Sequence, residues 1–116
     1  MMRLTAGVLA DAGAMSLEHE PVESAQVVAG SPLTGFARLD EASVGTLGVW
    51  EMTPGAMSDT EADEWFVVLR GDATVEFIDP PRPSVELGPG SVARLAEGMQ
   101  TVWTVRETLR KVYVSL

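Results

Sequence analysis

Few side chains in this chain of 116 residues have the chemistry for catalysis or for holding a metal. Cysteine is absent, which excludes disulfides, a thiol nucleophile and thiolate ligands. The one histidine, His19, lies in an irregular N-terminal part, so a serine nucleophile activated by histidine is not supported. The carboxylates of Glu51 and Glu64 remain, but nothing beyond residue type supports a glycosidase pair.

Charge and hydropathy bear on the partners of the chain. The net charge of −9 repels the phosphates of nucleic acids and the anionic surface of lipid bilayers. No apolar run approaches the roughly 20 residues that a membrane-spanning helix needs. The apolar residues 4–10 behind Arg3 are typical of a signal peptide, but Asp11 interrupts the run early. We therefore expect a cytoplasmic protein that binds neither nucleic acid nor membrane.

The elements that position these side chains are predicted to be strands. A hydrophobic fraction of 46% over this length fits one folded domain. Residues 1–24 are expected to form an irregular N-terminal segment of unassigned role, followed by a β domain over residues 25–116. There, short runs rich in β-branched and aromatic residues alternate with Gly, Pro and Asp clusters. The expected strands are residues 25–28, 36–39, 44–52, 64–70, 73–78, 84–87, 91–95, 100–105 and 110–116.

Turn signals separate these runs. Gly71-Asp72 lies between two strong runs and predicts a hairpin, and Gly88-Pro89-Gly90 predicts a second turn. Residues 79–83 contain three prolines and predict a loop outside any sheet. The acidic residues 59–64 could form one helical turn, and no other segment has helical periodicity. The pattern predicts an all-β fold, a single-domain barrel or sandwich of the jelly-roll form.

Alternation within the runs assigns side chains to faces. Thr101 and Trp103 share one face of the run 100–105. Residues 65–69, in contrast, are all apolar, which indicates a strand that is covered on both faces. This run, together with sheet edges in the N-terminal half that need cover, predicts a homodimer.

Five segments carry a resemblance to a known family, namely residues 48–55, 63–71, 87–91, 98–103 and 110–114. In these segments the chain resembles the cupins. More narrowly, it resembles the small single-domain cupins related to the cupin domain of (S)-ureidoglycine aminohydrolase, a group of largely unassigned function. The resemblance implies a cupin-type jelly-roll β-barrel, and it supports the homodimer because cupins are commonly dimers.

The first part of the cupin pattern runs His-any-His, three or four residues, Glu, six residues, Gly. Glu64 and Gly71 fit its last two positions. With three intervening residues, the His-any-His pair falls on Ser58-Asp59-Thr60, which contains no histidine. The resemblance thus implies one ligand, Glu64, and two that are missing.

The second part runs Gly, five residues, Pro-any-Gly, two residues, His. Gly90 and Gly98 fit, and Thr101 stands where the histidine is expected. Three of the four usual ligands are therefore replaced. Transition metals in proteins depend on imidazole or thiolate, so we expect no metal and no cofactor. The alternative is a divalent metal such as Mg²⁺ or Mn²⁺, held weakly by the carboxylates of Glu64 and Glu51.

The resemblance also suggests a ligand site. Glu64 and Thr101 point at the same centre in the cupin pattern, and Phe66 and Trp103 follow them on the same strand faces. Glu51 is a further candidate, because Trp50-Glu51 belongs to the matching segments, but the side chain that faces inward stays open. Glu64 is either a general base or cation-binding group whose pKa burial raises, or a structural carboxylate paired with Arg70 or Arg94.

Three functions follow from these observations. The favoured one is a metal-free cupin that binds a small polar organic molecule in the barrel, to sense it, carry it or perform mild acid–base chemistry. The second is an enzyme related to ureidoglycine aminohydrolase, acting on a ureide or amino-acid-like compound; the absence of histidines at 58, 60 and 101 counts against it. The third is a dimeric structural or regulatory module without a ligand. Catalysis stays undecided, with Glu64 as the best candidate residue.

Overall fold

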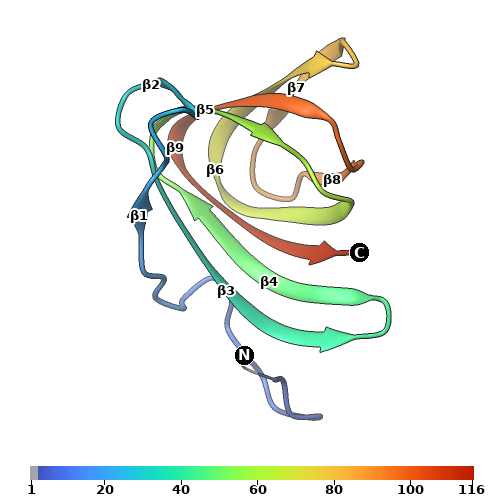
Figure 1. Ribbon diagram of the computed structural model, residues 1–116. Coiled ribbons are helices and arrows are strands. Elements are labelled where there is room, and N and C mark those ends of the chain that lie inside the picture. The colour runs from blue at the N-terminus through green and yellow to red at the C-terminus, as the bar shows by residue number, and fades with distance from the viewer. Residues whose placement is uncertain (1–2) are drawn as a thin grey trace.

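Residues 3–116 fold entirely into strands and loops. The structure, a computed structural model, describes residues 3–116 (Figure 1), and this part contains no helix that could cross a membrane. The predicted all-β class is confirmed. The strands are β1 (Glu20–Pro21), β2 (Val27–Ala29), β3 (Leu33–Ala42), β4 (Gly45–Met52), β5 (Gly55–Thr60), β6 (Glu64–Asp79), β7 (Arg82–Leu87), β8 (Val92–Leu95) and β9 (Gln100–Ser115).

All strand pairs are antiparallel and form one sheet that curls into a half-barrel (Figure 1). The path β1-β3-β4-β9-β5-β2 contains most of it, and β6 joins β9 to β7 and β8. The long strand β9 pairs with β5 through its first half and with β4 through its second half, while β6 runs along its other side. β6 and β9 thus extend through both halves of the curl.

The hairpin predicted at Gly71-Asp72 is wrong, because β6 continues through this dipeptide. The pairing of β6 with β9 shifts register repeatedly between Val68 and Ala73, so the strand bends here instead of reversing. Gly71 has a φ of +112°, and a Cβ at this position would lie 2.5 Å from the carbonyl oxygen of Thr108. A glycine such as Gly71 is typical of a hairpin turn and also of a β-bulge, so the sequence does not distinguish the two. The pairing of β6 with β9 makes it a bulge.

Other boundaries differ less. The turn at Gly88-Pro89-Gly90 is confirmed between β7 and β8, whereas Arg82 and Pro83 of the predicted loop belong to β7, an edge strand that tolerates proline. The runs 100–105 and 110–116 are one strand, β9. β5 was missed because its residues have little β propensity, and the short β1 lies within the segment expected to be irregular.

The inner face of the curl holds the core. Buried apolar side chains from β4, β5, β6 and β9 meet there, with Leu87 and Leu95 closing the side of β7 and β8. Trp103 is the largest side chain that is fully buried. Its ring lies 5.6 Å from that of Trp50 and 5.8 Å from that of Phe66 in tilted arrangements, which are favourable for aromatic pairs.

Residues 12–19 of the N-terminal segment lie against the outer face of β4 and β9. Arg110 of β9 faces outward and donates from Nη1 to the carbonyl oxygens of Ala12 and Met15, at 3.0 and 2.6 Å. Its Nε binds Glu51 Oε1 at 3.0 Å, and Glu51 Oε2 lies 2.7 Å from Nε2 of His19. We call residues 12–19 the strap, because this network ties them to the sheet.

We predict that Arg110→Ala destabilises the protein by about 3 kcal/mol, because it leaves the buried carboxylate of Glu51 without its main partner. Urea unfolding would measure the loss, and proteolysis should cut the strap of the variant faster. Arg106→Ala removes the exposed pair with Asp72 and serves as the control with a far smaller effect. Equal losses in the two variants would contradict this account.

The outer face of β6, β8 and β9 presents an apolar patch whose members are adjacent in the strand register, namely Trp65, Val67, Val92, Val112 and Val114. Trp65 is 47% exposed and Val92 78% exposed. We predict that this patch forms the interface of the expected homodimer, so that Trp65→Glu gives monomers in light scattering while Val44→Glu, at an exposed turn, does not. The mass of a single chain for the unchanged protein at micromolar concentration would refute the dimer.

Candidate functional site

Strand β9 places three polar or aromatic side chains of the site on the inner face of the curl. Thr101, Trp103 and Lys111 are all buried. Trp103 pairs directly with Met57 of β5 and Val75 of β6, so its indole lies in the middle of the core. The bend between the two halves of β9 brings Lys111 over this indole, with Nζ 4.7 Å from the ring centroid.

The ammonium of Lys111 lies among three aromatic rings. Besides Trp103, its Nζ is 4.8 Å from the ring centroid of Trp50 and 4.5 Å from that of Phe66. Glu64 Oε1 accepts a hydrogen bond from Nζ at 2.6 Å. Glu64 is therefore paired with a lysine, and the arginines proposed as its partners lie elsewhere: Arg70 near Glu51 and Arg94 near Asp63.

A second carboxylate, Glu61, is buried in the loop between β5 and β6. The Thr101 hydroxyl donates to its Oε2 at 2.6 Å, and Nε1 of Trp103 donates to the same oxygen at 2.9 Å. Hydrogen bonds between the main chains of Glu61, Met99 and Gly98 hold the loop against the start of β9. The carboxylate thus receives two donors at a fixed position, which offsets much of the cost of its burial.

Asp59 is the third carboxylate of the group. It lies directly opposite Thr101 in the pairing of β5 with β9. Burial and the neighbouring carboxylate of Glu61 raise the pKa of Asp59 to about 6, against the attraction of Lys111. Asp59 therefore changes its charge close to neutral pH, as a general acid or base must.

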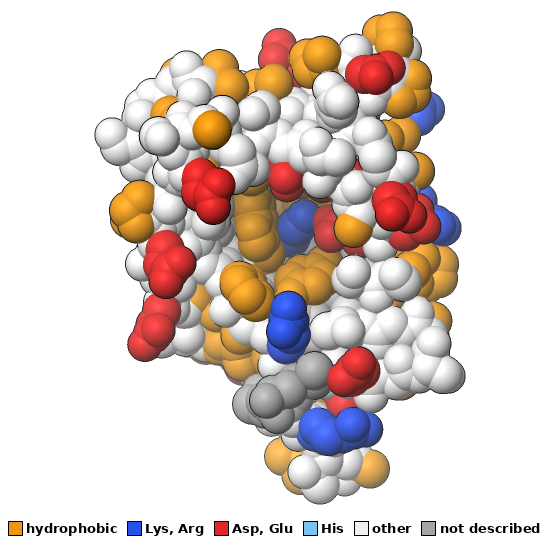
Figure 2. Space-filling model, in the orientation of Figure 1, with side chains coloured by type: hydrophobic (Ala, Val, Ile, Leu, Met, Phe, Trp, Pro, Cys, Tyr) orange, Lys and Arg blue, Asp and Glu red, His pale blue; other side chains and the backbone are white. Residues whose placement is uncertain are grey.

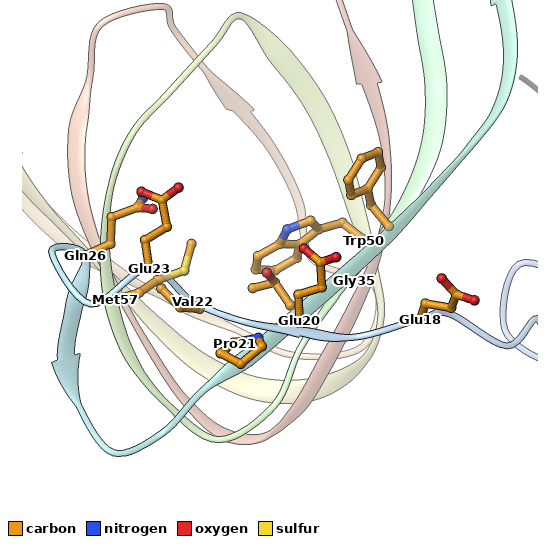
Figure 3. A pocket seen from close by; sticks show the side chains of 11 residues that line it. Glu18, Glu20, Pro21, Val22, Glu23, Gln26, Gly35, Trp50 and Met57 are labelled. Atoms are coloured by element: carbon orange, nitrogen blue, oxygen red, sulfur yellow. The ribbon is translucent and has the colours of Figure 1, made fainter.

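Cavities border this cluster on several sides. One of about 370 Å³ lies between Trp50 and Met57 on one side and residues of the N-terminal part, among them Glu20, Val22 and Gln26, on the other (Figure 3). A second, of about 510 Å³, borders Asp59 and Thr101 from the outer side of β5 and β9, where Ser58, Thr60, Gln100 and Val102 line it. A third, of about 350 Å³, reaches Phe66 on the inner face. In Figure 2, a hollow on this face contains basic, acidic and hydrophobic side chains.

The structure brings together four of the five side chains that were expected to bind a ligand. Glu64, Phe66, Thr101 and Trp103 all belong to the cluster around Lys111. Glu51 does not, because Trp50 faces inward and Glu51 faces the strap. Burial opposes ionisation of Glu51, but hydrogen bonds from Arg110 and His19 outweigh it and lower the pKa of this carboxyl.

The cupin ligand positions hold residues that do not fit a transition metal. Met57 and Asp59 pair with the buried Trp103 and Thr101, so residues 57 and 59 share the inner face. The His-any-His pair therefore falls on 57 and 59, with four residues before Glu64, and not on 58 and 60 as expected from the sequence. The set is then Met57, Asp59, Glu64 and Thr101. Within residues 3–116, no group of three or more His, Cys, Asp or Glu side chains is arranged to hold a metal ion.

Sequence reasoning missed three members of the cluster: Lys111, Glu61 and Asp59. Alternation along residues 110–116 places Lys111 and Tyr113 on one face of the run, but it does not show whether this face is the inner one. A lysine is rarely buried without a partner, so the pattern alone gives no reason to place Lys111 in the core. Glu61 lies outside any strand pattern, and no periodicity points to it.

Comparisons with known proteins place these residues in a family context. The model of the EutQ-like cupin domain matches residues 39–113, well over half of the chain. The comparison with curated proteins found no match.

Three solved structures of similar fold are distant from this chain in sequence. A protein of unknown function of the DUF861 family from Pseudomonas syringae pv. tomato is 22% identical with a TM-score of 0.73; the match covers 91% of this chain but only 46% of that protein. A putative ethanolamine utilization protein from Salmonella typhimurium is 18% identical with a TM-score of 0.62, over 89% and 97% of the two chains. The Clostridium difficile EutQ protein, also 18% identical, has a TM-score of 0.62 over 72% and 62%.

We predict that Asp59→Asn stabilises the protein above neutral pH and not below about pH 4. A raised pKa means that the folded state favours protonated Asp59, so the stability that this proton provides is present at low pH and is lost as the pH rises through about 6. Allowing for solvent screening at this partly exposed group, the gain is roughly 1 kcal/mol. Urea unfolding of both proteins across this range measures it, with exposed Glu76→Gln as control. A pH-independent difference would contradict the assignment.

Proposed function

Since this chain belongs to the family of EutQ-like cupin domains, and its ligand positions lack the usual imidazoles, we propose that it binds a small polar organic molecule in the barrel without a metal. The observation that carries the proposal is the cluster around Lys111, in which polar groups meet at a fixed place among aromatic rings. Small-molecule sites typically combine such apolar walls with a few convergent polar groups.

The cavities support a small ligand. Their volumes of about 350–510 Å³ fall in the lower part of the range of roughly 300–1,000 Å³ in which small-molecule sites are found. Trp50 lines the first cavity and also contacts Lys111, while Thr101 lines the second and also binds Glu61. A molecule in the first cavity would therefore meet Trp50, a member of the cluster, whereas a molecule in the second would lie on the outer side of β5 and β9.

Mild acid–base chemistry is a second candidate, and one observation favours it. Asp59 has a pKa of about 6 and lies across from Thr101 at the edge of a cavity, so it could give or take a proton at neutral pH. Glu64 is less suited to this role than expected, because its carboxylate is already bound to Lys111. A reaction of the ureidoglycine aminohydrolase kind rests on the resemblance alone.

Binding can be tested through the three tryptophans. Trp50 and Trp103 belong to the cluster, whereas Trp65 is 47% exposed on the outer face and serves as an internal control. We expect that a ligand found by titrating small polar amines, carboxylates, ureides and neutral polyols shifts the indole N–H signals of Trp50 and Trp103 in NMR spectra, with saturation, and leaves that of Trp65 unchanged.

Two further results bear on the same proposal. Asp59→Asn should weaken binding, or abolish turnover if a reaction occurs, without loss of the folded spectrum. If no compound of these classes shifts Trp50 or Trp103, or if Trp65 shifts equally, the barrel is not the binding site and the structural-module alternative gains support.

A further inference from the structure

The position of Lys111 calls for a physical explanation, because a lysine side chain that is only 7% exposed gives up most of its hydration. Removing an ammonium from water costs several kcal/mol unless other groups replace the water. Lys111 receives that replacement from one carboxylate, Glu64, and from the faces of Trp50, Phe66 and Trp103. Aromatic faces attract ammonium groups within about 6 Å of the ring centroid, and all three rings meet this limit.

The rings come from separate strands that the curl of the sheet brings together. Trp50 belongs to β4, Phe66 to β6 and Trp103 to β9. Trp103 is held in turn by its hydrogen bond to the buried carboxylate of Glu61. An enclosure of this kind, with ring faces on three sides and a carboxylate on another, is chemically suited to an ammonium group.

We propose that this enclosure is an ammonium-binding site, and that the side chain of Lys111 is its resident cation, in place of the metal ion of cupins with the full ligand set. Glu64 occupies the glutamate position of the cupin pattern, the one ligand position that keeps its usual residue. Its carboxylate is bound to the ammonium of Lys111. Aromatic faces attract ammonium groups but are not ligands for transition metals, which take imidazole, thiolate or carboxylate. The barrel is thus selective for an ammonium over a metal ion, whether or not a ligand enters the neighbouring cavities.

The test removes the resident cation and offers another. Lys111→Ala deletes three methylene groups and the ammonium, a volume that n-propylammonium matches. We expect the variant to unfold roughly 10 °C lower than the unchanged protein, because Glu64 loses its partner. n-Propylammonium chloride at millimolar concentration should recover several degrees with saturation, while 1-propanol, which lacks the charge, and sodium chloride should not. The unchanged protein should respond to none of these additions.

A second set of measurements tests whether the enclosure binds a metal ion instead of an ammonium. MnCl₂ and ZnCl₂ should not stabilise Lys111→Ala more than the unchanged protein, and elemental analysis of the untagged unchanged protein should find no stoichiometric metal. If Mn²⁺ or Zn²⁺ stabilises the variant and n-propylammonium does not, the enclosure is a metal site that Lys111 blocks, and the proposal is overturned. Recovery by 1-propanol equal to that by n-propylammonium would show mere cavity filling and would also overturn it.

If Lys111→Ala does not fold, a second pair of variants decides. Lys111→Met keeps the volume and removes the charge, and Glu64→Gln removes the matching carboxylate. We expect Lys111→Met to be rescued in part by the added Glu64→Gln, since the double variant leaves no uncompensated charge. Strictly additive losses would mean that the ammonium and the carboxylate are independent, which contradicts a resident cation.

Discussion

The structure depends on the pairing of β6 with β9, the two strands that run through both halves of the curled sheet. Because they bend together, residues that are far apart along β9, such as Trp103 and Lys111, meet on its inner face. The two residues are eight positions apart, so in a straight strand their Cα atoms would be separated by roughly 26 Å. The bulges near Gly71 are therefore as important for the cluster as the side chains that form it.

The cluster also shows how a small barrel accommodates several charges. In the part of the chain that the structure describes, every buried side-chain nitrogen or oxygen has a hydrogen-bond partner. Burying paired charges seldom stabilises a fold more than a well-packed apolar core would. What the arrangement contributes is a defined orientation for each group, and the interior of this domain is consequently polar at one fixed place and apolar elsewhere.

The sequence allowed correct inferences wherever a period of two residues governs the side chains. It predicted that Thr101 and Trp103 share a face, and the resemblance pointed to Glu64 as an inner residue. It could not assign Trp50 and Glu51, because neighbours on a strand face opposite ways and both sides of β4 are covered. Lys111 and Glu61 were not accessible to such reasoning, since a compensated charge depends on partners distant in sequence.

Arg110 and Lys111 are neighbours that send their charges to opposite faces of β9. On the outer side, the guanidinium group of Arg110 donates hydrogen bonds to main-chain carbonyl oxygens of the strap. Arg70 donates in the same way to the carbonyl oxygen of Gly13. Main-chain oxygens are supplied by any amino acid, so these hydrogen bonds fix the path of residues 12–15 without depending on their side chains. This stretch is accordingly a place where the protein could acquire a new recognition sequence, by evolution or by engineering, without altering the barrel beneath it.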